Sequence, residues 1–261
     1  MILADPYDAF LLDLDGVLYR GHQAVPGAAD AVARLRSLGK RIVFVTNNSS
    51  RTPAGVADTL RRVGIAAEVE EVVTSALVTA DLLVSRGIAE AFVVGEEGVT
   101  DALRANGIRI ADSNAERAEA VVVGLDRAVD YAKLTRASLL VERGAALVAT
   151  NADASFPAPD GAWPGAGALL AAIEATTGAR ADVVGKPHPP LLRAALEHAG
   201  DGRPLLVGDR LDTDIAGAAG LGWDSLLVLT GISTREDLAT APARPTFVGD
   251  DLSVLFRPTP G

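Results

Sequence analysis

Residues 10–19, which read FLLDLDGVLY, decide the fold of this chain. A short apolar run of this kind suits a buried parallel strand, and it ends in two carboxylates separated by one residue. Asp13 is then expected at the carboxyl end of the strand, and Asp15 in a loop that Gly16 allows to turn. Ligands bind at this edge of open α/β sheets, and two adjacent carboxylates there need a cation or a shared proton. An isolated Asp-x-Asp-Gly is also common as a simple turn, so this interpretation depends on the rest of the chain.

The chain beyond this stretch alternates between helix and strand patterns. A helical apolar spacing over 27–38 is followed by a buried strand at 41–45, which predicts a β-α-β unit with parallel strands. The Pro- and Gly-rich segment 156–167 is predicted to be a long loop. Further strands are predicted at 91–94, 120–123, 146–149, 182–185, 204–208 and 225–229. The predicted fold class is therefore α/β, with a doubly wound parallel sheet.

The composition excludes several classes of protein. The chain has 261 residues, is 49% hydrophobic and contains no cysteine, so we expect a packed core without disulfides or thiolate chemistry. Its net charge of −10 argues against a nucleic-acid partner. The first residues lack the features of a signal peptide, and no apolar run approaches the roughly 20 residues of a membrane span. We therefore expect a cytoplasmic protein with no membrane association.

Polar residues follow four of the predicted strands. If these strands share one parallel sheet, the polar residues meet at one edge and form a site for magnesium and phosphate. Magnesium prefers oxygen ligands, while hydroxyl, amide and ammonium groups neutralise or bind phosphate oxygens. Each group has an ordinary structural explanation by itself, but their joint occurrence favours a site. The groups are Asp13 with Asp15, Thr46 with Asn47 and Asn48, Lys186, and Asp209 with Asp214.

These residues lie in four motifs that resemble those of the haloacid dehalogenase (HAD) superfamily. In chain order the motifs are DLDGV at 13–17, TNNSSR at 46–51, GKP at 185–187 and GDRLDTDI at 208–215. The TNNSS form and the long insert between the second and third motifs resemble the 4-nitrophenyl phosphatase-like branch. That branch includes phosphoglycolate, glycerol-3-phosphate, pyridoxal-phosphate and nucleotide phosphatases, and the resemblance covers nearly the whole chain.

The resemblance implies a role for each motif in phosphate ester hydrolysis. Asp13 would be the nucleophile that becomes an aspartyl-phosphate, and Asp15 the general acid and base. Thr46 and Asn47 would bind the transferring phosphoryl group, with Asn48 a less certain neighbour. Lys186 would hold the nucleophile and the phosphate and stabilise the charge of the transition state.

The resemblance also implies a magnesium ion as cofactor. Its ligands would be Asp13, the backbone carbonyl of Asp15, Asp209 and Asp214, the last binding either directly or through water. Metal in this position would screen the nucleophile and the phosphate from each other. Asp212 is expected to be a turn residue.

The insert is expected to be a cap of α/β structure that selects the substrate. We predict a core of residues 1–78 and 182–261 and a cap of residues 79–181. A cap that closes over the site excludes water and contacts the leaving group. Asn151 and Asp153, which follow a predicted cap strand, are candidates for substrate binding, although ordinary turn chemistry explains them equally well. An exposed cap surface could also pair two copies in a homodimer.

The function predicted is a magnesium-dependent phosphomonoesterase acting on a small phosphorylated metabolite. Glycerol 3-phosphate or 2-phosphoglycolate is the first substrate expected by resemblance, with sugar phosphates, nucleotides and pyridoxal phosphate as alternatives. Two other classes remain: a receiver-like signalling protein that holds a phospho-aspartate, and a non-catalytic phosphate-binding module. The large insert argues against a receiver, and the complete motif set argues against a binding module. A dinucleotide-dependent oxidoreductase is not expected, because no Gly-x-Gly-x-x-Gly follows the first strand.

Overall fold

The computed structural model describes residues 1–158, 160–200 and 202–258, and the chain forms two compact units. The first unit consists of Met1–Thr46, Pro53–Val73 and Lys186–Gly261. The second unit consists of Asn47–Thr52 and Thr74–Gly185. Its limits are a few residues wider than the cap of 79–181 expected from the sequence, and it includes the short segment 47–52, which the sequence placed in the core.

The first unit is built on a sheet with the strand order β15-β14-β13-β1-β4-β5, and the register is parallel from β15 to β4. The chain leaves β1 towards β4 on one side and returns at β13 on the other, so β1 lies at the point where the strand order reverses. Ligand sites form at the carboxyl edge at this point. The strands are β1 (Ala9–Leu12), β4 (Arg41–Thr46), β5 (Val72–Thr74), β13 (Pro204–Gly208), β14 (Asp224–Val228) and β15 (Phe247–Gly249).

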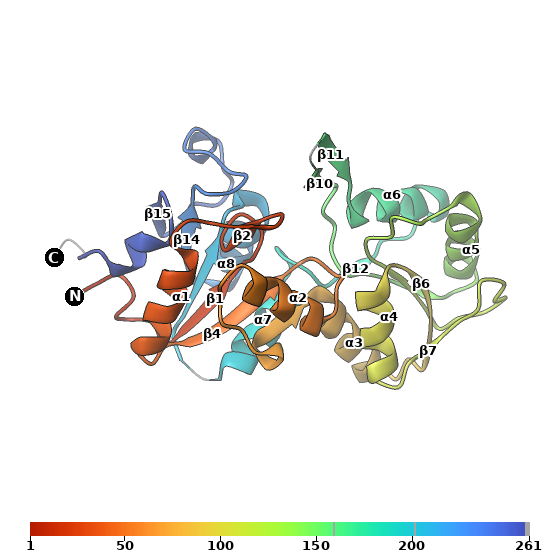
Figure 1. Cartoon of the computed structure of the whole chain (residues 1–261). Helices are drawn as coiled ribbons and strands as arrows, with labels where there is room; N and C mark the ends of the chain where they lie inside the picture. The colour runs from red at the N-terminus through yellow and green to blue at the C-terminus, as the bar shows by residue number, and fades with distance from the viewer. Residues whose placement is uncertain (159, 201, 259–261) are drawn as a thin grey trace. The chain divides into compact units, whose positions relative to one another are not determined.

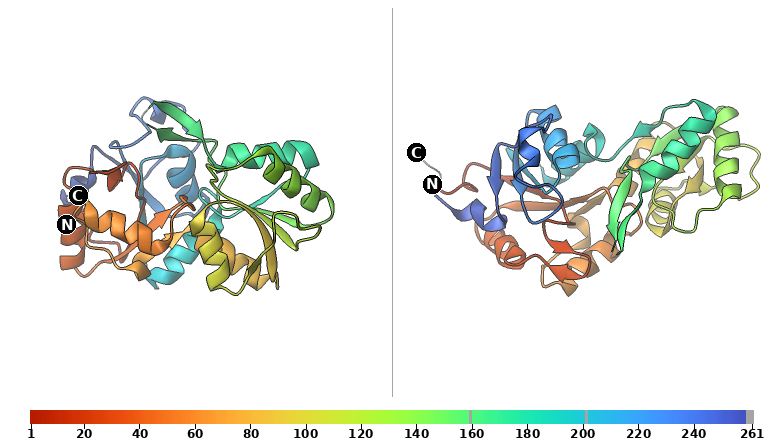
Figure 2. Two further views of the ribbon diagram at one scale, coloured as in Figure 1. Left: turned by 45° about the vertical axis from the view of Figure 1, so that its right-hand side comes forward. Right: turned by 90° about the horizontal axis from the view of Figure 1, so that it is seen from above.

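Helices cover both faces of this sheet, as Figures 1 and 2 show. Alternate strand residues, such as Phe10 and Phe44, pack with the apolar sides of α1 (Ala28–Ser37) and α2 (Pro53–Arg62). Because side chains alternate along a strand, the buried residues between them face the opposite side, where α7 (Pro189–Ala199) packs on β1 and β4. The helix α8 (Ala216–Leu221) contacts β14. The predicted doubly wound α/β fold is confirmed.

Short elements complete the first unit. The two strands of a small antiparallel hairpin follow the loop after β1, and several single turns join the longer elements. These elements are β2 (Tyr19–Arg20), β3 (Gln23–Ala24), η1 (Val69–Glu71), η2 (Leu211–Ile215), η3 (Asp237–Ala239) and η4 (Leu252–Phe256).

The second unit has a parallel sheet of its own, with the strand order β12-β9-β8-β6-β7. Apolar residues on one face pack under α5 and α6, while α3 and α4 lie on the other face (Figure 1). The strands are β6 (Glu90–Val94), β7 (Arg109–Ile110), β8 (Ala120–Val123), β9 (Ala146–Ala149) and β12 (Asp182–Val183). The helices are α3 (Ser75–Ser85), α4 (Glu97–Ala105), α5 (Tyr131–Glu142) and α6 (Ala166–Thr177).

Two sequence predictions about strands were wrong. The strand before Lys186 was expected in the same sheet as β1, but β12 pairs with β9, with Asp182 opposite Val148, in the sheet of the second unit. A two-residue strand carries too little pattern to indicate which sheet it joins. The predicted loop 156–167 contains an antiparallel hairpin of β10 (Ser155–Ala158) and β11 (Gly161–Pro164). Its Pro and Gly residues hid the strand pattern.

The helices of both units are short. The helices α5 and α6 have 12 residues each, about 18 Å of helix at 1.5 Å per residue, against the roughly 30 Å of a bilayer core. Within the described part of the chain, no helix combines the length and the apolar character that crossing a bilayer requires.

An ion pair joins α1 to η1 and gives a prediction about stability. The guanidinium of Arg36 donates two hydrogen bonds to the Glu71 carboxylate, at 2.6 and 2.7 Å. Burial by itself would raise the pKa of Glu71, but these bonds outweigh it and leave that pKa below its usual range. A carboxyl group with a lowered pKa stabilises the folded state above its unfolded pKa, and the effect disappears as the pH falls.

We therefore predict that Glu71→Gln lowers the free energy of unfolding by about 1 kcal/mol at pH 7, since the pair is partly exposed. The difference from the wild type should shrink as the pH falls below about 4.5. Urea unfolding at pH 7 and at pH 4 measures both effects. Glu70→Gln, at the exposed neighbouring position, is the control and should change little. A difference that stayed constant with pH would contradict the assignment.

Candidate active site

The centre of the candidate site is the ammonium group of Lys186. Its Nζ donates to Oδ1 of Asp13 at 2.5 Å and to Oδ1 of Asp214 at 2.7 Å. Lys186 is 3% exposed and Asp214 1%, so the three charges interact with little solvent between them. Asp13 directly follows β1, Asp214 lies in η2, and Lys186 begins the segment that leads to α7.

Asp209 lies beside this group, directly after β13, and is held by the loop that follows β14. The backbone N–H of Ile232 donates to Asp209 Oδ2 at 2.7 Å, and that of Ser233 donates to the Asp209 carbonyl at 3.1 Å. A Cβ on Gly231 would overlap the Asp209 carboxylate, and one on Gly16 would lie 2.5 Å from Oδ2. Asp209 can therefore occupy this position only because residues 16 and 231 are glycines without a Cβ.

The three carboxylates form an acidic cluster that suits a cation. One oxygen each of Asp13, Asp209 and Asp214 lies within 4.8 Å of the others. Three carboxylates and the single ammonium of Lys186 leave a formal balance of −2 if all are ionised. Buried negative charge of this size is costly, and oxygen donors of this kind are the ligands that magnesium takes. The residues present therefore fit a divalent cation.

The pKa values of the cluster reflect the same excess of negative charge. Burial raises the pKa of Asp13 well above its usual range, and repulsion from Asp214 and Asp209 adds to this against the attraction of Lys186. Burial and the charge of Asp214 raise the pKa of Asp209 to about 6. Burial would lower the pKa of Lys186, but Asp13 and Asp214 outweigh it and the net shift is upward. The lysine therefore stays charged, while the acids gain from added positive charge.

Thr46 and Asp15 lie at the same edge of the sheet. Thr46 is buried at the end of β4, the strand that pairs with β1. Asp15 is exposed, in the turn after β1, where its backbone forms a bridge with Tyr19 and the N–H of Gly16 donates to the Tyr19 carbonyl. The first unit thus contains Asp13, Asp15, Thr46, Lys186, Asp209 and Asp214 of the site residues predicted from the sequence.

The other four predicted site residues belong to the second unit, where Asn151 and Asp153 bind Asn47 and Asn48 binds Ser50. Asn151 Nδ2 donates to the Asn47 carbonyl at 2.8 Å, and Asn47 Nδ2 donates to Asp153 Oδ2 at 3.2 Å. Asn48 Oδ1 accepts hydrogen bonds from the backbone N–H and the hydroxyl of Ser50. The sequence did not predict the contacts of Asn47 with Asn151 and Asp153, because they join residues about a hundred positions apart.

Sequence reasoning also missed the loop that supports Asp209. Gly231, Ile232 and Ser233 act mainly through backbone groups and through the absence of a side chain. The available signal was the short segment TGIS at 230–233, which contains a glycine and follows a predicted strand directly. A run of this kind is common in turns, so it does not indicate a site by itself.

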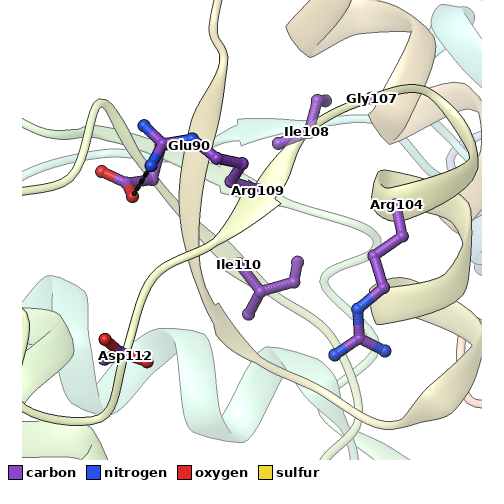
Figure 3. A pocket seen from close by; sticks show the side chains of 7 residues that line it. All are labelled: Glu90, Arg104, Gly107, Ile108, Arg109, Ile110 and Asp112. Carbon is purple, nitrogen blue, oxygen red and sulfur yellow. Dashed lines mark ion pairs between the residues drawn. The ribbon is translucent and has the colours of Figure 1, made fainter.

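A separate depression of about 510 Å³ lies in the second unit, beside β7 (Figure 3). Its charged lining consists of Arg104, Arg109, Glu90 and Asp112, with Arg109 paired to Glu90 at 3.3 Å. Positive and negative groups balance, and the Arg109 side chain is largely exposed. The acidic cluster of the first unit is therefore the better candidate for chemistry.

The fold and the acidic cluster define a class: a doubly wound α/β protein with a cation site at the switch point of its sheet and a second α/β unit inserted into it. Residues 10–109 match the family described as haloacid dehalogenase-like hydrolases, and residues 183–255 match the family described as HAD-hydrolase-like. The chain belongs to the haloacid dehalogenase-like hydrolases. This confirms the family predicted from the four motifs.

Curated relatives and solved structures match over nearly the whole chain. An acid sugar phosphatase of Staphylococcus saprophyticus is 37% identical, with 96% of this chain and 97% of that protein covered. An acid sugar phosphatase of Staphylococcus aureus is 40% identical, with 95% of this chain and 96% of that protein covered. The glycerol phosphate phosphatase of Mycobacterium tuberculosis in complex with magnesium superposes with a TM-score of 0.93 at 38% identity, covering 98% and 78%. The 4-nitrophenylphosphatase of Thermotoga maritima superposes with a TM-score of 0.91 at 35% identity, covering 98% of this chain and 98% of that one.

The close approach of Gly231 to Asp209 gives a prediction. In Gly231→Ala the added methyl group displaces the carboxylate, so we expect the free energy of unfolding to fall by about 1–3 kcal/mol. Gly220→Ala is the matched control, because a Cβ there meets no atom within 4 Å and alanine favours the helix α8. Urea unfolding of both variants tests this. Equal stability of the two variants would show that the Gly231 contact is unimportant.

Proposed function

We propose that this protein is a magnesium-dependent phosphomonoesterase that hydrolyses a small phosphorylated metabolite through an aspartyl-phosphate on Asp13. The observation that carries the proposal is the buried Lys186 ammonium between Asp13 and Asp214, beside the carboxylate of Asp209. The phosphatase names of the relatives and the magnesium complex of the glycerol phosphate phosphatase support it. Family membership favours turnover over the receiver-like and purely binding alternatives.

The proposed reaction begins at the Asp13 carboxylate. One oxygen of Asp13 attacks phosphorus, the bond from phosphorus to the ester oxygen breaks, and Asp15 gives a proton to the leaving alkoxide. Asp15 then takes a proton from water, whose oxygen attacks the same phosphorus and releases inorganic phosphate from Asp13. The exposed position of Asp15 suits a group that exchanges protons with the substrate and with water.

Charge control is the task of the groups around Asp13. The Lys186 ammonium holds Asp13 by a hydrogen bond and favours its ionised form, against the effect of burial. Asp214 in turn holds Lys186, and Asp209 remains as a further oxygen donor. A magnesium ion held by Asp13, the carbonyl of Asp15, Asp209 and Asp214 supplies positive charge that screens the nucleophile from the phosphate.

Phosphate binding is assigned to Thr46, Asn47 and Asn48 by their match to the second motif. The buried Thr46 at the end of β4 offers a hydroxyl at the edge where Asp13 lies. Lys186 also contributes its charge to phosphate binding. Substitution of each residue tests these assignments.

The substrate proposed first is glycerol 3-phosphate or 2-phosphoglycolate, and the glycerol phosphate phosphatase relative supports this choice. A sugar phosphate is the second candidate, because curated relatives at 37–40% identity are acid sugar phosphatases. Nucleotides and pyridoxal phosphate are further alternatives. Phosphate release from a panel of these esters distinguishes them, and a kcat/KM at least tenfold above the others identifies the preferred class.

We also propose a cytoplasmic location and a homodimer formed through the second unit, which we regard as the cap. Cell fractionation tests the location, and sedimentation of the full chain and of variants in exposed cap residues tests the dimer.

Asp13→Asn tests the nucleophile. An amide cannot form the phospho-enzyme, so we expect hydrolysis of 4-nitrophenyl phosphate to fall by at least about 10³-fold. Because burial and two neighbouring carboxylates oppose the charge of Asp13, the neutral amide should leave the protein folded. Circular dichroism and the melting temperature check the fold. Turnover near the wild-type rate would reject Asp13 as nucleophile.

Removal of the metal tests the acidic cluster. We expect excess chelator to abolish hydrolysis and added Mg²⁺ to restore it. Mg²⁺ at a hundred times its dissociation constant should also stabilise the wild type by about 2.7 kcal/mol, and Asp209→Asn much less. Thermal unfolding with and without Mg²⁺ measures this independently of activity. Full activity in excess chelator would remove magnesium from the mechanism.

A further inference from the structure

The segment 47–52, here called the motif-two loop, belongs to a different unit from the elements beside it. The strand β4 before it and the helix α2 after it are part of the first unit, yet the loop itself belongs to the second. A loop of six residues has no core of its own, so specific contacts must hold it. These contacts lie on α3 and α4 and in the loops that follow β8, β9 and β12.

The carbonyl of Asn47 is the first point of attachment. It accepts one hydrogen bond from Asn151 Nδ2 and one from Ser75 Oγ, each at 2.8 Å. Ser75 is the first residue of α3, and Asn151 follows β9 by two residues. Both donors are buried, so losing one would leave an acceptor poorly satisfied away from water.

A second attachment lies two residues further along the loop. Thr150 Oγ1 donates to Ser49 Oγ at 2.9 Å, and both residues are fully buried. The backbone N–H of Gly98, in the first turn of α4, donates to the Ser50 carbonyl at 3.2 Å. The loop is thus bound by both its backbone and its side chains.

Three glycines of the second unit make room for the loop. A Cβ on Gly98 would lie 2.5 Å from the carbonyl oxygens of Ser49 and Arg51. One on Gly124 would lie 2.7 Å from Ser49 Oγ, and one on Gly185 would lie 2.6 Å from Asn47 Oδ1. Such close packing at three positions indicates that the surface of the second unit is complementary in shape to the loop.

We propose that Asn151 is a positioning residue: with Ser75 and Thr150 it fixes the motif-two loop to the second unit, so that Asn47 moves with the cap. Its amide is used by the chain itself, which distinguishes this role from the substrate selection expected from the sequence. The catalytic consequence rests on the proposed function, in which the loop binds phosphate. Cap position and phosphate binding are then coupled for every substrate, whatever its leaving group.

The test uses Asn151→Asp in the full chain. This substitution keeps the size of the side chain but replaces the donor with an oxygen that repels the Asn47 carbonyl. We expect KM for 4-nitrophenyl phosphate and for a sugar phosphate to rise by the same factor, about tenfold, with the inhibition constant for inorganic phosphate rising equally. A variant that was merely less stable would lose active enzyme and lower kcat, but leave KM and the inhibition constant unchanged.

Hydrogen exchange provides a readout that does not depend on activity. The amides of residues 47–52 should exchange at least about tenfold faster in Asn151→Asp, while those of β6 keep the wild-type rate. Asn106→Asp is the matched control: Asn106 is exposed at the end of α4, and its Nδ2 donates to the Ala102 carbonyl of the same helix. Ser75→Ala removes the second donor and replaces Asn151→Asp if that variant does not fold.

The outcomes separate the two proposals. A wild-type protein without turnover of any phosphate ester would remove the proposed function, and the exchange experiment would still decide the role of Asn151. Unchanged exchange in the loop would overturn the positioning role. So would a change in KM for the sugar phosphate alone, because that result would assign Asn151 to substrate selection.

Discussion

The first unit depends on one electrostatic constraint, the burial of a single ammonium group among three carboxylates. Lys186 satisfies two of them directly, and its charge is retained because Asp13 and Asp214 outweigh the cost of burial. The remaining negative charge is not compensated by protein groups of the cluster, and burial raises the pKa values of Asp13 and Asp209. An arrangement of this kind is unfavourable for stability by itself, which is consistent with a site built for a cation and an anionic substrate.

The sheet explains how these groups meet. Asp13 and Asp209 directly follow β1 and β13, which pair in parallel with Leu12 opposite Val207, so both carboxylates leave the sheet at the same edge. The backbone N–H of Asp13 continues the ladder to the Val207 carbonyl, and the glycines at 16 and 231 let the neighbouring loops approach Asp209. The geometry of the site is thus set by strand register and by close backbone contacts, which long side chains could not provide.

In the second unit, the residues that follow β9 contact the motif-two loop, whereas those beside β7 line a depression. Asn151 and Thr150, which follow β9, are committed to the motif-two loop, while the depression beside β7 is lined by balanced charges. In the proposed positioning role Asn151 holds this loop, and contact with the leaving group then falls to other residues of this unit.

The local sequence determined most of the fold and the identity of the candidate catalytic groups. Local patterns specify these elements: a continuous apolar run such as 41–45 forms a strand, and Gly39 ends α1. The acids at 13 and 209 lie where two such apolar runs end. Only the tertiary structure decided that β12 joins the sheet of the second unit, that β10 pairs with β11, and that the motif-two loop is bound to Asn151. The reason is physical: these features depend on pairing and hydrogen bonds between residues with little pattern of their own, and their partners are chosen by the packing of the whole chain.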